Sequence, residues 1–267
     1  VAPAEKRSEL WTETQAWLKP YMKATQTLAA PDRCVCYREL LWRLETAMVP
    51  LPDVLLDPLQ QTMDELGAHL AAGERIQASL DVNLFGPISP TEIIDAWYTT
   101  AFALLRDARE TYHTERWETI VATIDMVAQR FPEQVELLQY ERALWAAWNL
   151  QRRQAKSILV QWQPSPRFPQ AMMWKAGLLA EVDEREAARS LLRLALLEIR
   201  RALRTQGQNS ELLSLEGWCM YLLFAVGTSL DPSKYRQLIF EFGERWQELK
   251  AWECSPWPVL EYFKMAL

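Results

Sequence analysis

The second half of the chain carries a pattern of small and apolar residues that repeats after 33 positions. Four pairs of residues share this step: Ala143 and Ala176, Ala155 and Ala188, Leu159 and Leu192, and Trp162 and Ala195. A fixed period of about 20 to 50 residues is typical of stacked helical repeats, because one unit cannot bury its apolar face without a neighbour. The period therefore predicts an extended helical body with a binding or scaffolding surface.

The composition favours an all-α fold. Of the 267 residues, 49% are apolar and 24% are charged, which is ordinary for a folded globular protein. Ala, Leu, Glu, Arg and Gln, which favour helices, dominate the sequence, and it has no long alternation of Val and Ile of the kind that strands show.

Charge and cysteine content restrict the partners and the compartment. A net charge of −6 argues against a general nucleic-acid binder, which usually has a basic surface. The four cysteines are widely spread, which indicates a reducing, cytoplasmic environment, and residues 1–9 do not resemble a secretory signal. The apolar stretch 217–230 is shorter than the roughly 20 residues of a spanning helix, so we expect no membrane insertion.

The positions of prolines and other turn-forming residues predict two regions in the chain. Residues 1–90 read as an irregular helical region, in which Pro20 predicts a kink or stop and Asp32 an N-cap. Residues 81–92 are rich in turn formers and look like a linker, so repeats with a C-terminal cap are expected over 91–267. Thr91 is the expected cap of the first repeat helix. The further expected helices span residues 115–131, 133–150, 151–162, 170–182, 184–205, 210–227 and 231–246.

This succession of helix, turn and helix resembles the tetratricopeptide repeat (TPR). In that family small residues stand where paired helices cross, and the Ala pairs of the 33-residue pattern match those positions. A preceding unit keeps the internal spacing with Ala108, Ile120, Ile124, Val127 and Pro132. The pattern departs from the family at Trp162, where a small residue is usual. The resemblance covers roughly residues 98–250 and implies a TPR-like α-solenoid of antiparallel helix pairs.

The resemblance also implies a binding groove, because the first helix of each TPR pair lines the concave face. The positions carried over are Phe102, Leu105, Arg109 and Tyr112, then Leu137, Tyr140, Leu144 and Trp148, and then Met173, Gly177 and Glu181. Such an apolar, aromatic groove suits an amphipathic helix or an extended peptide. The Lys and Asn clamp with which some members hold a peptide carboxylate is missing. The alternative is that the Trp residues simply fill space between helices.

An arginine stripe offers a second candidate contact. Arg185, Arg189 and Arg193 step by four, and Arg200 and Arg204 follow. Guanidinium groups bind phosphate and carboxylate in a bidentate manner, so the stripe predicts a contact to phosphate or an acidic partner. The alternative is a solvated helix face on which Glu181 and Arg185 form an i,i+4 pair.

Sequence evidence for catalysis is weak. The chain has two histidines, His69 and His113, and it lacks the Gly-rich phosphate loops and the common zinc motifs. The pair Cys34 and Cys36 is better interpreted as packing than as a metal or disulfide site. We therefore expect no catalytic residue, no cofactor and no metal.

These observations leave three functional hypotheses. The first is a non-catalytic module that binds a protein, or its own copy, through an apolar groove. The second is a sensor or oligomerisation arm of a larger effector, since the run 174–188 resembles repeats attached to bacterial defence and signalling enzymes. The third is an all-α enzyme or ligand-binding protein with a Trp-lined pocket.

Overall fold

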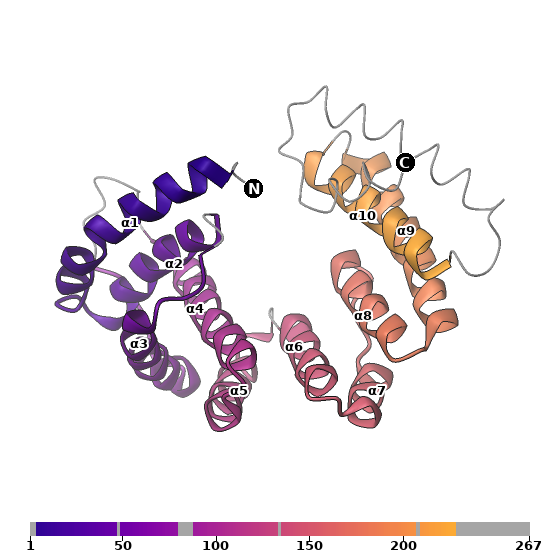
Figure 1. Ribbon diagram of the computed structural model, residues 1–267. Helices are drawn as coiled ribbons and strands as arrows, with labels where there is room; N and C mark the ends of the chain where they lie inside the picture. The colour runs from indigo at the N-terminus through magenta and orange to yellow at the C-terminus, as the bar shows by residue number, and fades with distance from the viewer. Residues whose placement is uncertain (1–3, 47–48, 80–87, 133–134, 207–208, 228–267) are drawn as a thin grey trace. The chain divides into compact units, whose positions relative to one another are not determined.

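The computed structural model describes residues 4–46, 49–79, 88–132, 135–206 and 209–227 (Figure 1). Every regular element in these ranges is a helix, which confirms the all-α class. The chain divides into two compact units, unit 1 over residues 1–135 and unit 2 over residues 136–267. The predicted boundary of the repeat region, between residues 90 and 91, lies inside unit 1.

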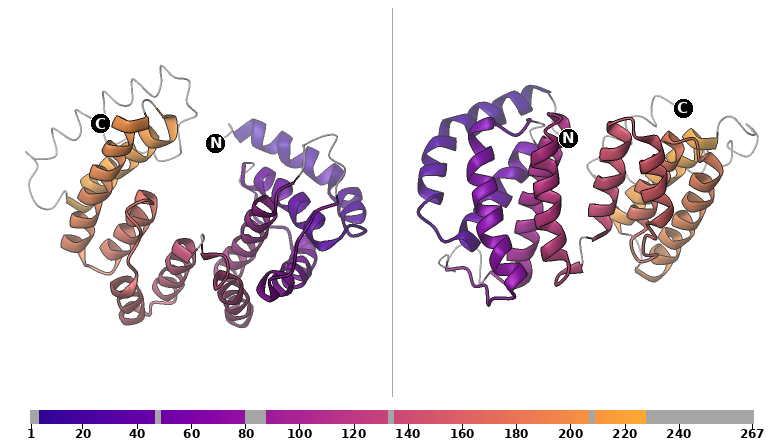
Figure 2. Two further views of the ribbon diagram at one scale, coloured as in Figure 1. Left: turned by 180° about the vertical axis from the view of Figure 1, so that it is seen from behind. Right: turned by 90° about the horizontal axis from the view of Figure 1, so that it is seen from below.

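Each unit contributes five of the described helices, which two further views show from behind and from below (Figure 2). Unit 1 holds α1 (Ala4–Thr25), α2 (Ala30–Thr46), α3 (Asp53–Ala72), α4 (Pro90–Glu110) and α5 (Thr114–Ala128). Unit 2 holds α6 (Val135–Trp148, apart from its first residue), α7 (Arg152–Gln161), α8 (Pro169–Glu181), α9 (Arg185–Gln206) and α10 (Ser210–Gly227). The predicted helix 231–246 and the predicted C-terminal cap lie outside the described residues.

In unit 1, α4 packs against α2, α3 and α5. The indole N–H of Trp97 donates to the carbonyl of Met63 at 2.8 Å, which fixes α4 on α3. Gly67 allows this close approach, because a Cβ atom there would lie 3.2 Å from the Trp97 ring and 3.2 Å from the Thr123 methyl.

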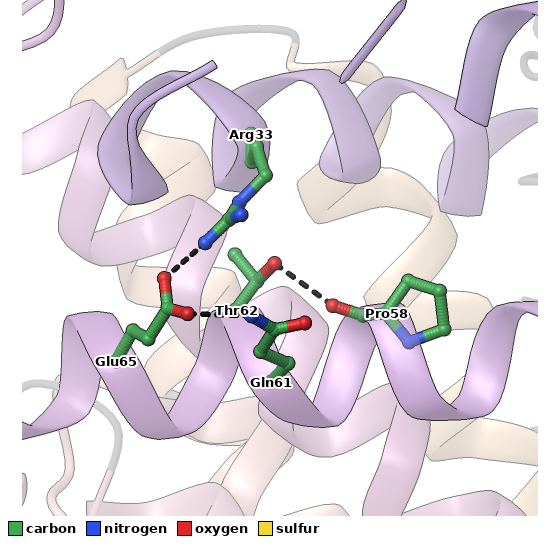
Figure 3. Close-up of polar contacts among 5 residues, drawn as sticks. All are labelled: Arg33, Pro58, Gln61, Thr62 and Glu65. Atoms are coloured by element: carbon green, nitrogen blue, oxygen red, sulfur yellow. Dashed lines mark hydrogen bonds and ion pairs between the residues drawn. The ribbon is translucent and has the colours of Figure 1, made fainter. Parts of the chain in front are cut away.

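Polar contacts connect α2 to α3 on the surface of unit 1 (Figure 3). Arg33 of α2 forms an ion pair with Glu65 of α3, and Gln61 donates to the same carboxylate at 2.7 Å. The Thr62 hydroxyl donates to the carbonyl of Pro58 at 2.8 Å. Since Thr62 and Pro58 lie on the same helix, only the Arg33 pair joins the two helices here.

The structure corrects three expectations about helix ends. Helix α1 continues through Pro20, so the helix does not stop there. Helix α2 begins at Ala30, which places Asp32 in its first turn rather than at the N-cap. Helix α4 is capped by Ser89 and not by Thr91: the Ser89 hydroxyl accepts from the Glu92 N–H at 3.2 Å, and the Glu92 carboxylate accepts from the Ser89 N–H at 2.7 Å.

In unit 2, α8 packs along α9 and α9 along α10 (Figure 1). The alanines of the 33-residue pattern are completely buried in one shared core, and they are Ala143, Ala155, Ala176, Ala188 and Ala195. Methyl side chains at these positions let helix backbones approach closely. The pattern therefore marks core contacts.

No described helix is long and apolar enough to cross a membrane.

The segment between α7 and α8 is fixed by polar contacts to both neighbouring helices. The Glu136 carboxylate of α6 accepts from the Trp162 indole at 2.6 Å and from the Ser165 N–H at 2.8 Å. The Lys175 ammonium of α8 donates to the Trp162 carbonyl at 2.5 Å, and burial lowers the pKa of this lysine. These bonds anchor the segment to α6 and to α8, the two helices that carry the candidate site.

Candidate binding groove

A groove of about 680 Å³ lies in unit 2 and is lined mainly by α6, α8 and α10. We call this surface the groove, and its lining residues are Tyr140, Leu144, Ala147, Trp148, Leu150, Arg152, Met173, Trp174, Gly177, Leu178, Glu181, Val182, Trp218 and Leu222. Its walls are largely apolar and aromatic, and the ring centroids of Tyr140 and Trp174 lie 5.3 Å apart across α6 and α8. Such a surface favours the burial of apolar and aromatic groups.

Six residues predicted for the concave face of two successive repeats come together in this groove: Tyr140, Leu144, Trp148, Met173, Gly177 and Glu181. Leu137 of the same prediction is half-buried and is not among the lining residues. The helix period explains the grouping, since positions three and four apart share one face of α6 and of α8.

The sequence did not point to the third wall of the groove. Trp218 and Leu222 of α10 line it. The 33-residue step does not reach them, because α9 has 22 residues and exceeds the length that the period allows. The apolar run 217–230 is the available signal, but from the sequence it indicates only that a membrane span is not expected.

The rim of the groove exposes apolar side chains. Trp148 is 41% exposed and Leu150 is 90% exposed. Leu150 also has a positive φ of 59°, a left-handed conformation that usually favours Gly or Asn. An exposed leucine in this conformation adds little to the stability of the fold.

The charged residues that line the groove are Arg152 and Glu181. Arg152 forms an ion pair with Asp183, which lowers the pKa of that aspartate through the hydrogen bond and the guanidinium charge. Among the residues that the structure describes, none forms an ion pair or hydrogen bond with Glu181. The unneutralised charge of the groove is therefore negative.

The predicted groove residues of the preceding repeat lie in unit 1. Phe102, Leu105 and Arg109 are buried, so they do not form an open surface, whereas Tyr112 is exposed. Tyr112 follows α4 in a left-handed conformation, with a φ of 56°.

The five arginines of the stripe differ in exposure and in their partners. Arg185, Arg193 and Arg204 are exposed, but Arg189 pairs with Glu186 of its own helix. The Arg200 side chain donates to the buried Glu216 carboxylate at 2.7 Å, which directs it to α10. Glu181 ends α8 and Arg185 begins α9, so the predicted i,i+4 pair on one helix is wrong.

The remaining reactive groups are scattered. In the described ranges, no group of three or more His, Cys, Asp or Glu is arranged to hold a metal. His69 is hydrogen-bonded to Glu74 at 2.6 Å, and His113 is exposed before α5. Cys34 and Cys219 are buried free thiols, and burial raises the pKa of each to about 12.

No protein-family model, curated protein or solved structure matches this chain. The groove itself is therefore the basis for a functional proposal.

Proposed function

We propose that this protein is a TPR-like helical-repeat module that binds an apolar segment of a partner protein in the groove of unit 2. The proposal is based on one observation: six residues of α6 and α8 that the TPR resemblance predicts on a concave face line the same groove. Open apolar grooves between helices commonly accept amphipathic helices or extended peptides.

Repeated turn geometry supports the TPR-like interpretation. Leu150 and Asp183, which are 33 positions apart, both follow a helix in the left-handed conformation. The Leu150 N–H bonds to the Ala147 carbonyl at 3.0 Å, and the Asp183 N–H bonds to the Ala180 carbonyl at 3.2 Å. The next N–H in each turn bonds five residues back, as in a Schellman motif. Within unit 2 this turn therefore recurs at the 33-residue step, whereas the same turn at Tyr112 in unit 1 lies 38 positions before Leu150.

The rim supports a binding role for the same surface. Trp148 and Leu150 expose apolar area beside the groove, and burial of such area is worth about 25 cal/mol per Å². Aromatic anchors of this kind typically dominate the affinity of an interface.

Trp148→Ala tests the proposal, with Trp42→Ala as a matched control because Trp42 is also exposed and lies in unit 1. Proteins that co-purify with the full chain from its native cell are identified, and their affinities are then measured. We expect Trp148→Ala to weaken the affinity for a groove-bound partner by about tenfold or more, and Trp42→Ala to leave that affinity unchanged. Equal binding by both variants would reject the groove as the binding surface.

A second candidate function is the binding of a small apolar ligand. The groove volume falls within the roughly 300–1,000 Å³ of small-molecule sites. This candidate is tested by titrating the protein with a panel of metabolites while Trp fluorescence is recorded. A saturable fluorescence change that is lost in Trp148→Ala would support it.

A further inference from the structure

Gly177 occupies a position in α8 that the internal packing of unit 2 does not explain. Glycine in a helix interior destabilises the helix by about 1 kcal/mol relative to alanine. A Cβ atom at Gly177 would meet no described atom within 4 Å. Its backbone is also helical, so no special φ requires glycine. The missing side chain instead leaves open space in the wall of the groove.

At Gly67, by contrast, other residues of this chain occupy the space that a side chain would take. At Gly67 the Trp97 ring and the Thr123 methyl lie 3.2 Å from the Cβ position, so an aromatic ring packs directly on the helix backbone. Both glycines lie in helix interiors. The aromatic ring is present at Gly67, and the corresponding space at Gly177 is empty in the part of the chain that the structure describes.

Glu181 supplies the charge that selects an occupant. It lies four residues after Gly177, one helical turn along the same face, and it also lines the groove. Its carboxylate has no described partner, while the groove's Arg152 is already paired with Asp183. An occupant with a cation near Glu181 would be complementary in charge, and one with a carboxylate there would be repelled.

We propose that the groove binds a segment of a partner protein that packs a large aromatic side chain on Gly177 and pairs a Lys or Arg with Glu181. This proposal rests on the proposed function and names the chemistry of its partner. Residues 251–267 of this chain contain two Glu and one Lys, so charge complementarity favours a separate, basic segment over this one.

A peptide display library tests the proposal with the full-length protein as target. Random peptides of about 15 residues, a length that helical peptides need, are mixed with segments of this chain and selected on the wild type. Peptides that also bind Gly177→Leu are removed, because leucine fills the open space. We expect the retained peptides to combine an aromatic residue with a Lys or Arg about one helical turn away.

Synthetic versions of the retained peptides then test the charge. Replacement of the peptide Lys or Arg by Glu is expected to weaken binding to the wild type by about tenfold or more. Glu181→Lys is expected to reverse this preference, whereas Glu118→Gln, a change at an exposed position of α5 in unit 1, is expected to leave it unchanged. Circular dichroism and melting of Gly177→Leu confirm that the variant folds, with Gly177→Ala as the smaller substitution if it does not.

The possible outcomes distinguish a failure of this inference from a failure of the proposed groove function. Peptides that need open space at Gly177 but bind equally well with Glu in place of Lys would overturn the inference and leave the groove function intact. A library whose peptides all bind Gly177→Leu as well as the wild type would also overturn the inference, and equal binding of these peptides to Trp148→Ala would overturn the groove function too. Selection of residues 251–267 as the preferred segment would show an occupant from this chain and would also overturn the inference.

Discussion

The Asp32 carboxylate accepts two hydrogen bonds from Ser79, one from its backbone N–H at 2.8 Å and one from its hydroxyl at 2.7 Å. The two residues are 47 positions apart, and Asp32 is completely buried. The contact ties the irregular segment after α3 to the first turn of α2. It also supplies hydrogen bonds to a buried carboxylate, which would otherwise be costly.

Asp32→Ala is expected to lower the free energy of unfolding by about 1–3 kcal/mol, because hydrogen bonds to a charged group are lost. Urea unfolding followed by circular dichroism measures the change. Asp57→Ala provides the control, since Asp57 is exposed on α3 and should matter by less than about 0.5 kcal/mol. Similar losses in both variants would contradict the structural role of the Ser79 contact.

Gly67 and Gly177, which both lie inside helices, should respond to alanine in opposite directions. Gly67→Ala forces a methyl group against Trp97 and Thr123 and should destabilise the protein by about 1–3 kcal/mol. Gly177→Ala meets open space and should stabilise α8 by up to about 1 kcal/mol. Melting temperatures measure both, and a lower value for Gly177→Ala would show that the space is not open.

Ala188 tests the buried positions of the 33-residue pattern. Ala188→Trp should overpack the core of unit 2, cost roughly 1–3 kcal/mol and lower the melting temperature, because Ala188 is completely buried. Ala187→Trp, at the neighbouring exposed position of α9, should change the melting temperature little. An unchanged melting temperature in Ala188→Trp would count against the core assignment.

The buried thiols should resist alkylation until the protein unfolds. Burial raises the pKa of Cys34 and of Cys219 to about 12, so the reactive thiolate is scarce at pH 8. Peptide mass spectrometry after iodoacetamide treatment should find both cysteines unmodified in the native protein and modified in urea. Rapid native labelling of either thiol would contradict its burial.

The same pKa shifts predict a loss of stability in alkali. The folded protein holds these thiol protons more tightly than the unfolded chain, whose cysteines titrate near pH 8.5–9. The thiol contribution to stability is therefore fully present below about pH 8.5 and is lost as the pH rises toward 12. Cys219→Ala should show a weaker decline of stability over that window in urea titrations, and an identical decline would argue against the contribution of Cys219.

Local patterns in the sequence were sufficient to predict the helices that the structure describes in unit 2. The expected helix over 210–227 coincides with α10, and the expected helices 151–162 and 170–182 differ from α7 and α8 by one residue at each end. Periodicity and prolines act over neighbouring residues, so they carry this information. The expected helix 115–131 ends too late, because α5 ends at Ala128, before Pro132.

Composition and helix period were sufficient to predict the all-α class and the alanines at helix contacts, and the TPR resemblance pointed to the six residues of α6 and α8 that line the groove, which share a face because they are spaced by four. The tertiary structure alone decided that Trp218 and Leu222 complete the groove and that Arg200 turns toward Glu216. It also decided that Gly67 is filled while Gly177 is open. Such contacts join residues far apart in the chain, and they depend on helix lengths and packing that no local pattern encodes.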